Sequence, residues 1–127
     1  MTDWIKFLSL SPKEYNCWTF IEKIQTDVKV WNSELQNLYD TKKHKWGEHI
    51  TFKDIEKLAE NNYRIKVELK DLQPHDILMF GVNDVRPLHF GLYIGKNQFI
   101  HLRKIPKIDD LDDYWRARLK LIYREEK

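Results

Sequence analysis

The chain of 127 residues has little of several things that mark specialised classes of protein. It contains one cysteine, so an intrachain disulfide is impossible and no oxidising compartment is required. It has four glycines and four prolines, and no repeat, low-complexity tract or linker divides it. Hydrophobic residues make up 42% of the chain, which is a globular composition, so we expect a single domain over residues 1–127.

An excess of one charge and long apolar runs are also missing. The 22 basic and 20 acidic residues are interleaved, so a nucleic-acid partner is not indicated. No apolar run approaches the ~18 residues that span a bilayer, so no membrane partner is expected. The start, MTDWIKFLSL, lacks the pattern of a signal peptide. As encoded, the chain is therefore expected to be cytoplasmic, or exported by another route such as assembly into a larger particle.

Helical periodicity dominates the first half of the chain and strand periodicity the second. Apolar spacing predicts helices over residues 17–28, with Asn16 as N-cap, then over 31–38, and over 51–60, which Thr51 and Asp54 begin as a capping box. Alternation or short apolar runs predict strands at 65–69, 77–80, 88–94, 98–102 and 119–123. This order predicts an α+β fold, with helices packed on one face of a small antiparallel sheet.

The lone cysteine stands at the start of the first predicted helix. Free amide groups and the positive end of the helix dipole favour a thiolate there, so Cys17 is a candidate nucleophile with a lowered pKa, opening into a cleft. The alternative is a buried cysteine packed as a small hydrophobe. Tyr15 is a candidate to bind an oxyanion alongside the backbone N–H of Cys17, and Trp18 to line the site. A packed aromatic is the alternative for both.

Two of the five histidines bracket the alternating stretch HFGLYIGKNQFIH. In a hairpin with a three-residue loop, His89 is the diagonal neighbour of His101 on one face of the sheet. The same register puts Phe99 on the histidine face instead of the apolar face, a conflict that a bulge near Gly95 or Lys96 would resolve. The hairpin then predicts a base, which takes the thiol proton, and a second imidazole that orients it.

Two other interpretations of these residues stay open at this point. The histidines could be solvated or core-edge side chains of an ordinary hairpin. Alternatively, Cys17, His89 and His101 could hold a zinc ion, although neither a fourth ligand nor a cysteine pair is evident. We favour the nucleophile with its base and orienter, and expect neither metal nor cofactor.

Three segments together resemble the NlpC/P60 family of cysteine peptidases: YNCWTFIEKI, LQPHDILMF and HFGLYIGKNQFIH, in the family's order. They are similar to its nucleophile segment, its L-x-P-G-D strand and its histidine hairpin, and the resemblance covers roughly residues 14–102. It implies a papain-like fold, with Cys17 as nucleophile, His89 as base and His101 as orienter. It also implies hydrolysis of amide bonds in peptidoglycan stem peptides, often between D-glutamate and a diamino acid.

The chain departs from the family pattern at several positions. Asn16 stands in place of Asp, Thr19 in place of a Gly, where it is expected to crowd the helix start, and His75 in place of the Gly before Asp76. No L-P-R-T/S segment lies between residues 30 and 60. These departures keep two alternatives open: an inactive scaffold with an assembly partner, such as a phage-tail component, and a Cys–His acyl hydrolase or transferase with another substrate.

Overall fold

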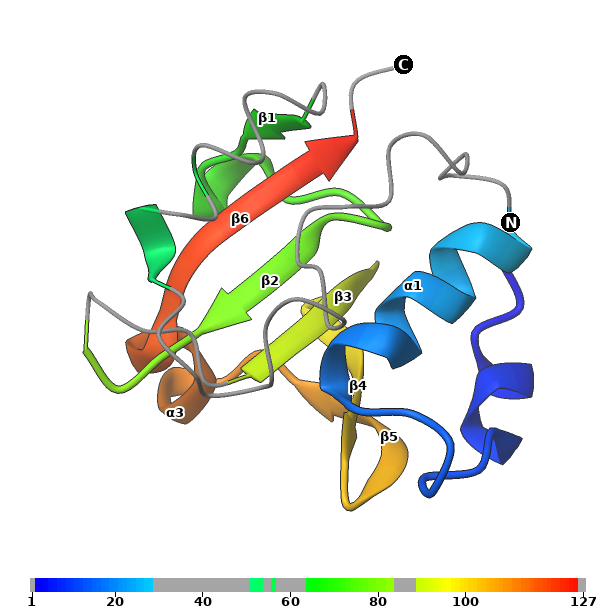
Figure 1. Cartoon of the computed structure of the whole chain (residues 1–127). Coiled ribbons are helices and arrows are strands. Elements are labelled where there is room, and N and C mark those ends of the chain that lie inside the picture. Colours follow the sequence, from blue (N-terminus) through cyan, green and yellow to red (C-terminus); the bar gives the residue numbers. More distant parts are fainter. Residues whose placement is uncertain (1, 29–50, 54–55, 57–63, 84–88, 126–127) are drawn as a thin grey trace.

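The computed structural model describes residues 2–28, 51–53, 56, 64–83 and 89–125 (Figure 1). A 3-10 turn, η1 (Ile5–Ser9), and a helix, α1 (Cys17–Asp27), come first. The helix predicted over 31–38 lies outside the described residues. Of the helix predicted over 51–60, only four residues are described, and 52, 53 and 56 are helical.

The second half of the chain forms one antiparallel sheet of six strands, in the order β1-β6-β2-β3-β4-β5. Strands β2, β3, β4 and β5 pair in chain order, and β6 returns to lie between β1 and β2. The strands are β1 (Arg64–Lys66), β2 (Ile77–Phe80), β3 (His89–Gly95), β4 (Gln98–Arg103), β5 (Ile105–Asp110) and β6 (Leu119–Glu125). Two short helical elements join them: η2 (Leu69–Asp71) and α3 (Asp113–Arg118). None of the described helices has the length and apolar character that crossing a bilayer demands.

Helix α1 covers one face of the sheet, against β3 and β4 (Figure 1). Its apolar side chains recur at helical spacing, so one stripe is buried: Trp18, Phe20, Ile21 and Ile24 are fully buried. They pack on the side chains that alternate strand positions turn to the same face, including Phe90, Leu92 and Ile100. The predicted helix over 17–28 is therefore confirmed.

The N-terminal helix on one face of an antiparallel sheet confirms the predicted α+β, papain-like fold. The opposite face of the sheet is also apolar, and a short helix that the sequence did not predict packs against it. There Leu78, Phe80, Phe99 and Ile122 pack against Trp115 of α3. Asp112 caps this short helix by accepting a hydrogen bond from the N–H of Trp115 at 3.1 Å. Helix α3 was not predicted, because six residues are too few to show periodicity. Strand β5 was not predicted either, because Pro106 and its acidic residues are not typical of a strand.

The β3–β4 hairpin has the pairing that places Phe99 on the histidine face. Tyr93 pairs with Phe99, then Gly95 pairs with Gln98, so the register shifts by one residue at Ile94. Lys96 and Asn97 both have positive φ and close a two-residue turn. The bulge is where it was expected, but Phe99 remains on the histidine face, because that face has an apolar cluster of its own.

Strand β1 is shorter than expected. The alternation of Ile65, Val67 and Leu69 predicted a strand through residue 69, but the strand ends at Lys66 and Leu69 begins the turn η2. Val67 keeps one ladder hydrogen bond, from its N–H to the carbonyl of Ile122, and is buried. Leu69 is 44% exposed, so its place in the apolar alternation does not correspond to burial.

The corner before β2 is held by His75 and Asp76. His75 has a φ of 77°, the left-handed region that favours glycine, which explains the glycine of the family pattern at this position. Its ring instead hydrogen-bonds Thr2 at 2.7 Å and Gln25 at 2.8 Å. The buried carboxylate of Asp76 accepts two hydrogen bonds from Arg124, both at 2.8 Å. These contacts tie the first helix and the last strand to β2.

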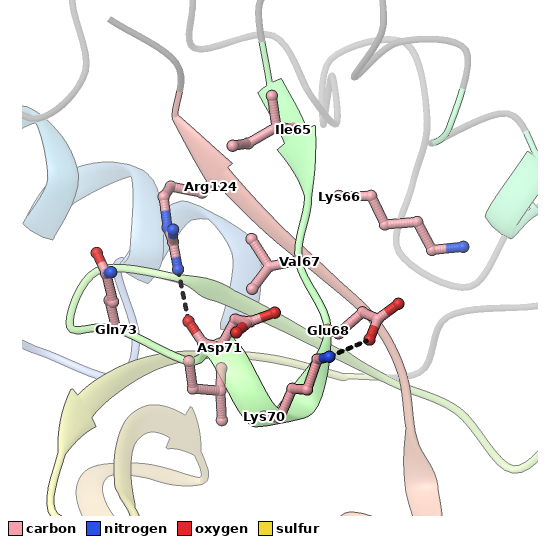
Figure 2. Close-up of a pocket in the computed structure, with 9 residues that line it drawn as sticks. Ile65, Lys66, Val67, Glu68, Lys70, Asp71, Gln73 and Arg124 are labelled. Atoms are coloured by element: carbon pink, nitrogen blue, oxygen red, sulfur yellow. Dashed lines mark hydrogen bonds and ion pairs between the residues drawn. The ribbon is translucent and has the colours of Figure 1, made fainter.

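A hollow of about 660 Å³ opens beside this corner, lined from β1, η2 and β6 (Figure 2). Figure 2 shows Arg124 directed at the backbone of Asp71, and Lys70 beside Glu68. Among the described residues, no cysteine or histidine lines this hollow. The chemistry predicted from the sequence lies elsewhere, at the end of the sheet where β3 begins and β4 ends.

Candidate active site

Cys17 is the first residue of α1, as predicted. The side-chain oxygen of Asn16 accepts hydrogen bonds from the N–H groups of Trp18, at 3.0 Å, and Thr19, at 2.8 Å. The backbone N–H of Asn16 in turn donates to the hydroxyl of Thr19, at 2.8 Å. Thr19 therefore completes a capping box and does not crowd the helix start, which corrects the expectation raised by its replacing a glycine.

His89 and His101 lie side by side on β3 and β4, and their placement on one face is confirmed. Nε2 of His89 lies 2.6 Å from Nδ1 of His101, and the two rings are nearly perpendicular, at 75°. The diagonal pairing of the hairpin brings them together, because Leu92 pairs with Ile100 and Tyr93 with Phe99. His101 is fully buried, whereas His89 is partly exposed.

A carboxylate that the sequence analysis missed extends this pair. Nε2 of His101 lies 2.6 Å from Oδ2 of Asp109 on β5. Lys107 also lies 3.5 Å from the same oxygen. Strand alternation in the segment IPKIDD could have indicated this carboxylate: Asp109 points to the same face as Lys107, the residue that pairs with His101. It could be used only once β5 was known to be a strand.

The hydrogen bonds assign the tautomers of both rings. Burial raises the pKa of Asp109, but its interactions with His101 and Lys107 together outweigh burial, so the pKa is lowered. The ionised carboxylate accepts the hydrogen bond, and Nε2 of His101 carries the proton. Burial lowers the pKa of His101, so its ring is neutral and Nδ1 is an acceptor. Nε2–H of His89 therefore donates to it. Nδ1 of His89 is left unprotonated and available as a base.

Aromatic rings hold the two imidazoles in place. The ring of Trp115 lies with its centroid 5.8 Å from that of His89 and 5.2 Å from that of His101. Phe80 stacks on His89 at 6.1 Å, and Phe99 lies 4.5 Å from His101. Gly91 permits this packing, since a Cβ there would meet the ring of Phe99 at 2.8 Å. Close packing of the Phe99 ring therefore accounts for the glycine at position 91.

Cys17 and His89 line the same hollow, of about 310 Å³, and Tyr15 lines it with them. Cys17 is 9% exposed, so its side chain reaches the hollow from a mostly buried position. In the described part of the chain, no hydrogen bond joins Sγ of Cys17 to His89. Trp18 does not line the hollow: it is fully buried and packs on Phe90 with ring centroids 4.9 Å apart. Of the two aromatic candidates, only Tyr15 is at the site.

The electrostatics of the thiol differ from the sequence-based prediction of a lowered pKa. Burial raises the pKa of Cys17 to about 12, although backbone N–H groups of Phe90, Cys17 and Trp18 oppose this. Burial lowers the pKa of His89 to about 3, and repulsion from His101, when that ring is protonated, and from Arg103 contributes to the shift. In this state the site therefore holds a neutral thiol and a neutral imidazole, not an ion pair. The reason is that desolvation outweighs the helix N-terminus.

The zinc alternative has a different geometry from the one found. Both ring nitrogens of His101 are engaged, one by His89 and the other by Asp109. Within the residues that the structure describes, no three His, Cys, Asp or Glu side chains are grouped so as to hold a metal ion. His101 therefore hydrogen-bonds His89, and the two rings do not direct free nitrogens at a shared position where a metal ion could bind.

The NlpC/P60 family model matches residues 6–124 of this chain. No curated protein sequence matches it. One similar solved structure is that of an NLP/P60 family protein, described as similar to a lipoprotein, from Staphylococcus aureus. The two are 17% identical, with a TM-score of 0.44, over 60% of this chain and 30% of that one. From the matched length, this chain belongs to the NlpC/P60 family, a family of cysteine peptidases and amidases that act on peptidoglycan.

Proposed function

We propose that this protein is a cysteine amidase or endopeptidase that hydrolyses amide bonds in peptidoglycan stem peptides. In this proposal Cys17 is the nucleophile, His89 the general base and His101 the residue that orients it. One observation carries it: the hydrogen-bonded chain from Asp109 through His101 to His89, which leaves one ring nitrogen of His89 free in the hollow that Cys17 also lines.

The reaction begins from the neutral pair. As Sγ of Cys17 attacks the scissile carbonyl carbon, its proton passes to Nδ1 of His89. The positive charge that develops on His89 is stabilised by the hydrogen bond to His101, which the Asp109 carboxylate supports in turn. Concerted transfer suits these groups, because a separated thiolate and imidazolium are each disfavoured by burial.

The tetrahedral intermediate then collapses to an acyl-enzyme. His89 returns its proton to the leaving amine nitrogen, and the C–N bond breaks. Water next attacks the thioester, giving its proton to His89, and the acid departs as the thiol of Cys17 is restored. The oxyanion is proposed to be stabilised by the backbone N–H of Cys17 at the start of α1, with the hydroxyl of Tyr15 lining the same hollow.

Purified muropeptides provide the test. The wild-type protein should release new amine and carboxyl termini, detected by mass spectrometry, and Cys17→Ala should remove the activity while circular dichroism stays unchanged. His89→Ala should have a similar effect. An inactive wild type on both muropeptides and simple acyl substrates contradicts the proposal and leaves the scaffold alternative in its place. A Tyr15→Phe variant with unchanged turnover would exclude that hydroxyl from the mechanism.

A further inference from the structure

His89 also lines a second hollow, of about 300 Å³. It is lined by the start of β3, the end of β4 and helix α3. His89 and Arg103 line both this hollow and the one that contains Cys17. The two hollows therefore meet at the base of the proposed reaction. A substrate whose scissile bond lies at Cys17 can continue past His89 into this second hollow.

Two guanidinium groups line the second hollow, each held by an aromatic ring of α3. Arg118 lies over the ring of Tyr114, 3.7 Å from its centroid, and donates a hydrogen bond to the Tyr114 carbonyl at 2.9 Å. Arg103 lies 5.7 Å from the ring centroid of Trp115. Tyr114 and Trp115 are neighbours, with centroids 5.2 Å apart. Stacking restricts both side chains, so less entropy is lost when they bind an anion.

Neither guanidinium has an acidic partner in the part of the chain that the structure describes. Asp109 pairs with His101 and Lys107, and Asp76 pairs with Arg124, so neither carboxylate pairs with Arg103 or Arg118. Two arginines that share a hollow without a carboxylate repel each other, and an anion between them relieves that repulsion. Arginine presents a planar fork that matches a carboxylate.

We propose that this hollow is a subsite for a carboxylate of an acidic peptide substrate, bound by Arg103 and Arg118 beside His89. The inference rests on the proposed function for the identity of the substrate, but not for the binding itself. It also has a consequence for the base. The charge of Arg103 helps to lower the pKa of His89, and a carboxylate bound to Arg103 offsets that charge. Substrate binding therefore makes His89 a stronger base.

Binding is tested on the full-length Cys17→Ala variant, which has no nucleophile. The probes are L-Ala-γ-D-Glu-L-Lys and the same tripeptide with both carboxylates amidated. We expect the acidic tripeptide to bind about tenfold more tightly and to shift the NMR signals of the Arg103 and Arg118 side chains. Arg103→Gln and Arg118→Gln should each remove most of this preference, and Arg118→Lys should retain part of it.

Lys70→Gln is the matched control. It removes one positive charge at a 77% exposed side chain that lines other hollows, so the preference for the acidic tripeptide should be unchanged. Equal affinity for the two tripeptides overturns the proposal, as does a preference that survives Arg103→Gln and Arg118→Gln. Inorganic phosphate that competes as well as the acidic tripeptide at equal concentration would replace the carboxylate site by a general anion site.

The two proposals fail in different ways. If Cys17→Ala binds the acidic tripeptide selectively but the wild type cleaves no muropeptide, the subsite stands and the hydrolase proposal falls. If the wild type cleaves acidic and amidated stem peptides with the same kcat/KM, the hydrolase stands and the subsite falls. An inactive wild type whose Cys17→Ala variant also binds both tripeptides equally overturns both.

Discussion

Asp109 is the residue on which the orientation of the proposed base depends. It is the only partner that fixes which nitrogen of His101 carries a proton among the described residues, and through His101 it fixes the tautomer of His89. It is 32% exposed, while His101 is fully buried. The carboxylate therefore links a buried pair of rings to the solvent-facing edge of the sheet.

Replacing this carboxylate by an amide tests its role as a positioning residue. We expect Asp109→Asn to lower kcat by about 10-fold to 100-fold with little change in KM, a part of what general acid–base catalysis contributes. A neutral amide supports His101 less well than a carboxylate does, so the positive charge that develops on His89 in the transition state is less stabilised. Asp109→Glu should recover part of kcat. A KM effect alone, or an unchanged pH profile in Asp109→Asn, contradicts this role.

The reactivity of Cys17 without substrate follows from its raised pKa. With a pKa of about 12, almost none of the thiol is ionised near neutrality, so iodoacetamide should modify Cys17 more slowly than free cysteine at pH 8. The rate should keep rising through pH 10. Mass spectrometry after timed quenching measures it. A rate that reaches a plateau near pH 6 would instead indicate a preformed thiolate–imidazolium pair and contradict the burial argument.

At the scale of the elements, the packing of the strands depends on the backbone conformation or the absence of a side chain at two positions. The corner before β2 needs a positive φ at His75, and the β3–β4 packing needs the missing side chain of Gly91. The first position departs from the family glycine and recovers stability through side-chain hydrogen bonds. The second retains glycine, because the ring of Phe99 occupies the space.

Variants at His75 separate backbone strain from hydrogen bonding. Both His75→Ala and His75→Gly lose the hydrogen bonds of the imidazole ring to Thr2 and Gln25 and keep the one that Gln25 donates to the backbone carbonyl. Only His75→Ala keeps a Cβ at a φ of 77°, so it should be about 1 kcal/mol less stable than His75→Gly. Urea denaturation of the two variants and the wild type measures the difference. Equal stability of the two variants would show that this corner is unstrained.

A methyl group at Gly91 should disturb the histidines through Phe99. Gly91→Ala places a Cβ 2.8 Å from that ring, which must shift, at a cost of about 1–3 kcal/mol. Since the Phe99 ring lies 4.5 Å from that of His101, the imidazole signals of His101 should move as well. Urea denaturation and NMR of the histidine rings measure both effects. A variant as stable as the wild type, with unmoved imidazole signals, contradicts this.

At the scale of the whole molecule, the site lies at the start of β3, next to the apolar clusters on both faces of the sheet. The α1 cluster contains Cys17, and the cluster of Trp115 surrounds the histidines. Neutral forms of Cys17, His89 and His101 are thus part of the packing on both faces. The stability of the fold should therefore depend on pH at both ends of the range.

On the acid side, the folded-state pKa values of His89 and His101 lie below the unfolded value of 6.5. The unfolded chain then binds more protons, so the free energy of unfolding should fall as the pH drops from about 6.5 towards 3. On the alkaline side, the raised pKa of Cys17 means that stability should fall as the pH rises from about 9 to 12. Urea midpoints across this range measure both the acid limb and the alkaline limb of the stability profile, the pH ranges in which the free energy of unfolding falls.

Two variants assign the limbs of this profile. His89→Gln should reduce the loss of stability on the acid side, leaving the part that His101 contributes, and should not change the alkaline side. Cys17→Ser should remove the alkaline loss only, because serine does not ionise in this range. An acid limb that is unchanged in His89→Gln would mean that another group controls it. Protonation of Asp109 adds a further loss only below its ordinary pKa of 3.8, since its folded-state pKa is lowered.

What the sequence determined by itself was local: periodicity, spacing and motif. Helix α1 with its cap at Asn16, the strands β2, β3, β4 and β6, and the pairing of His89 with His101 follow from periodicities of 3.6 and 2 residues, which short-range backbone geometry imposes. The family resemblance followed from motifs of the same local kind. Parity also revealed the conflict at Phe99 but could not decide its outcome: a bulge is present near Gly95, and Phe99 still lies on the histidine face.

Only the tertiary structure decided what depends on neighbours distant in the chain. The role of Asp109 required β5 to be placed beside β4, and the second apolar face required α3 to fold over Phe80 and Phe99. Burial decided the ionisation of Cys17, because desolvation is a property of the surroundings and outweighed the favourable position at the helix start. Spacing along the chain carries no information on how much solvent remains around a side chain.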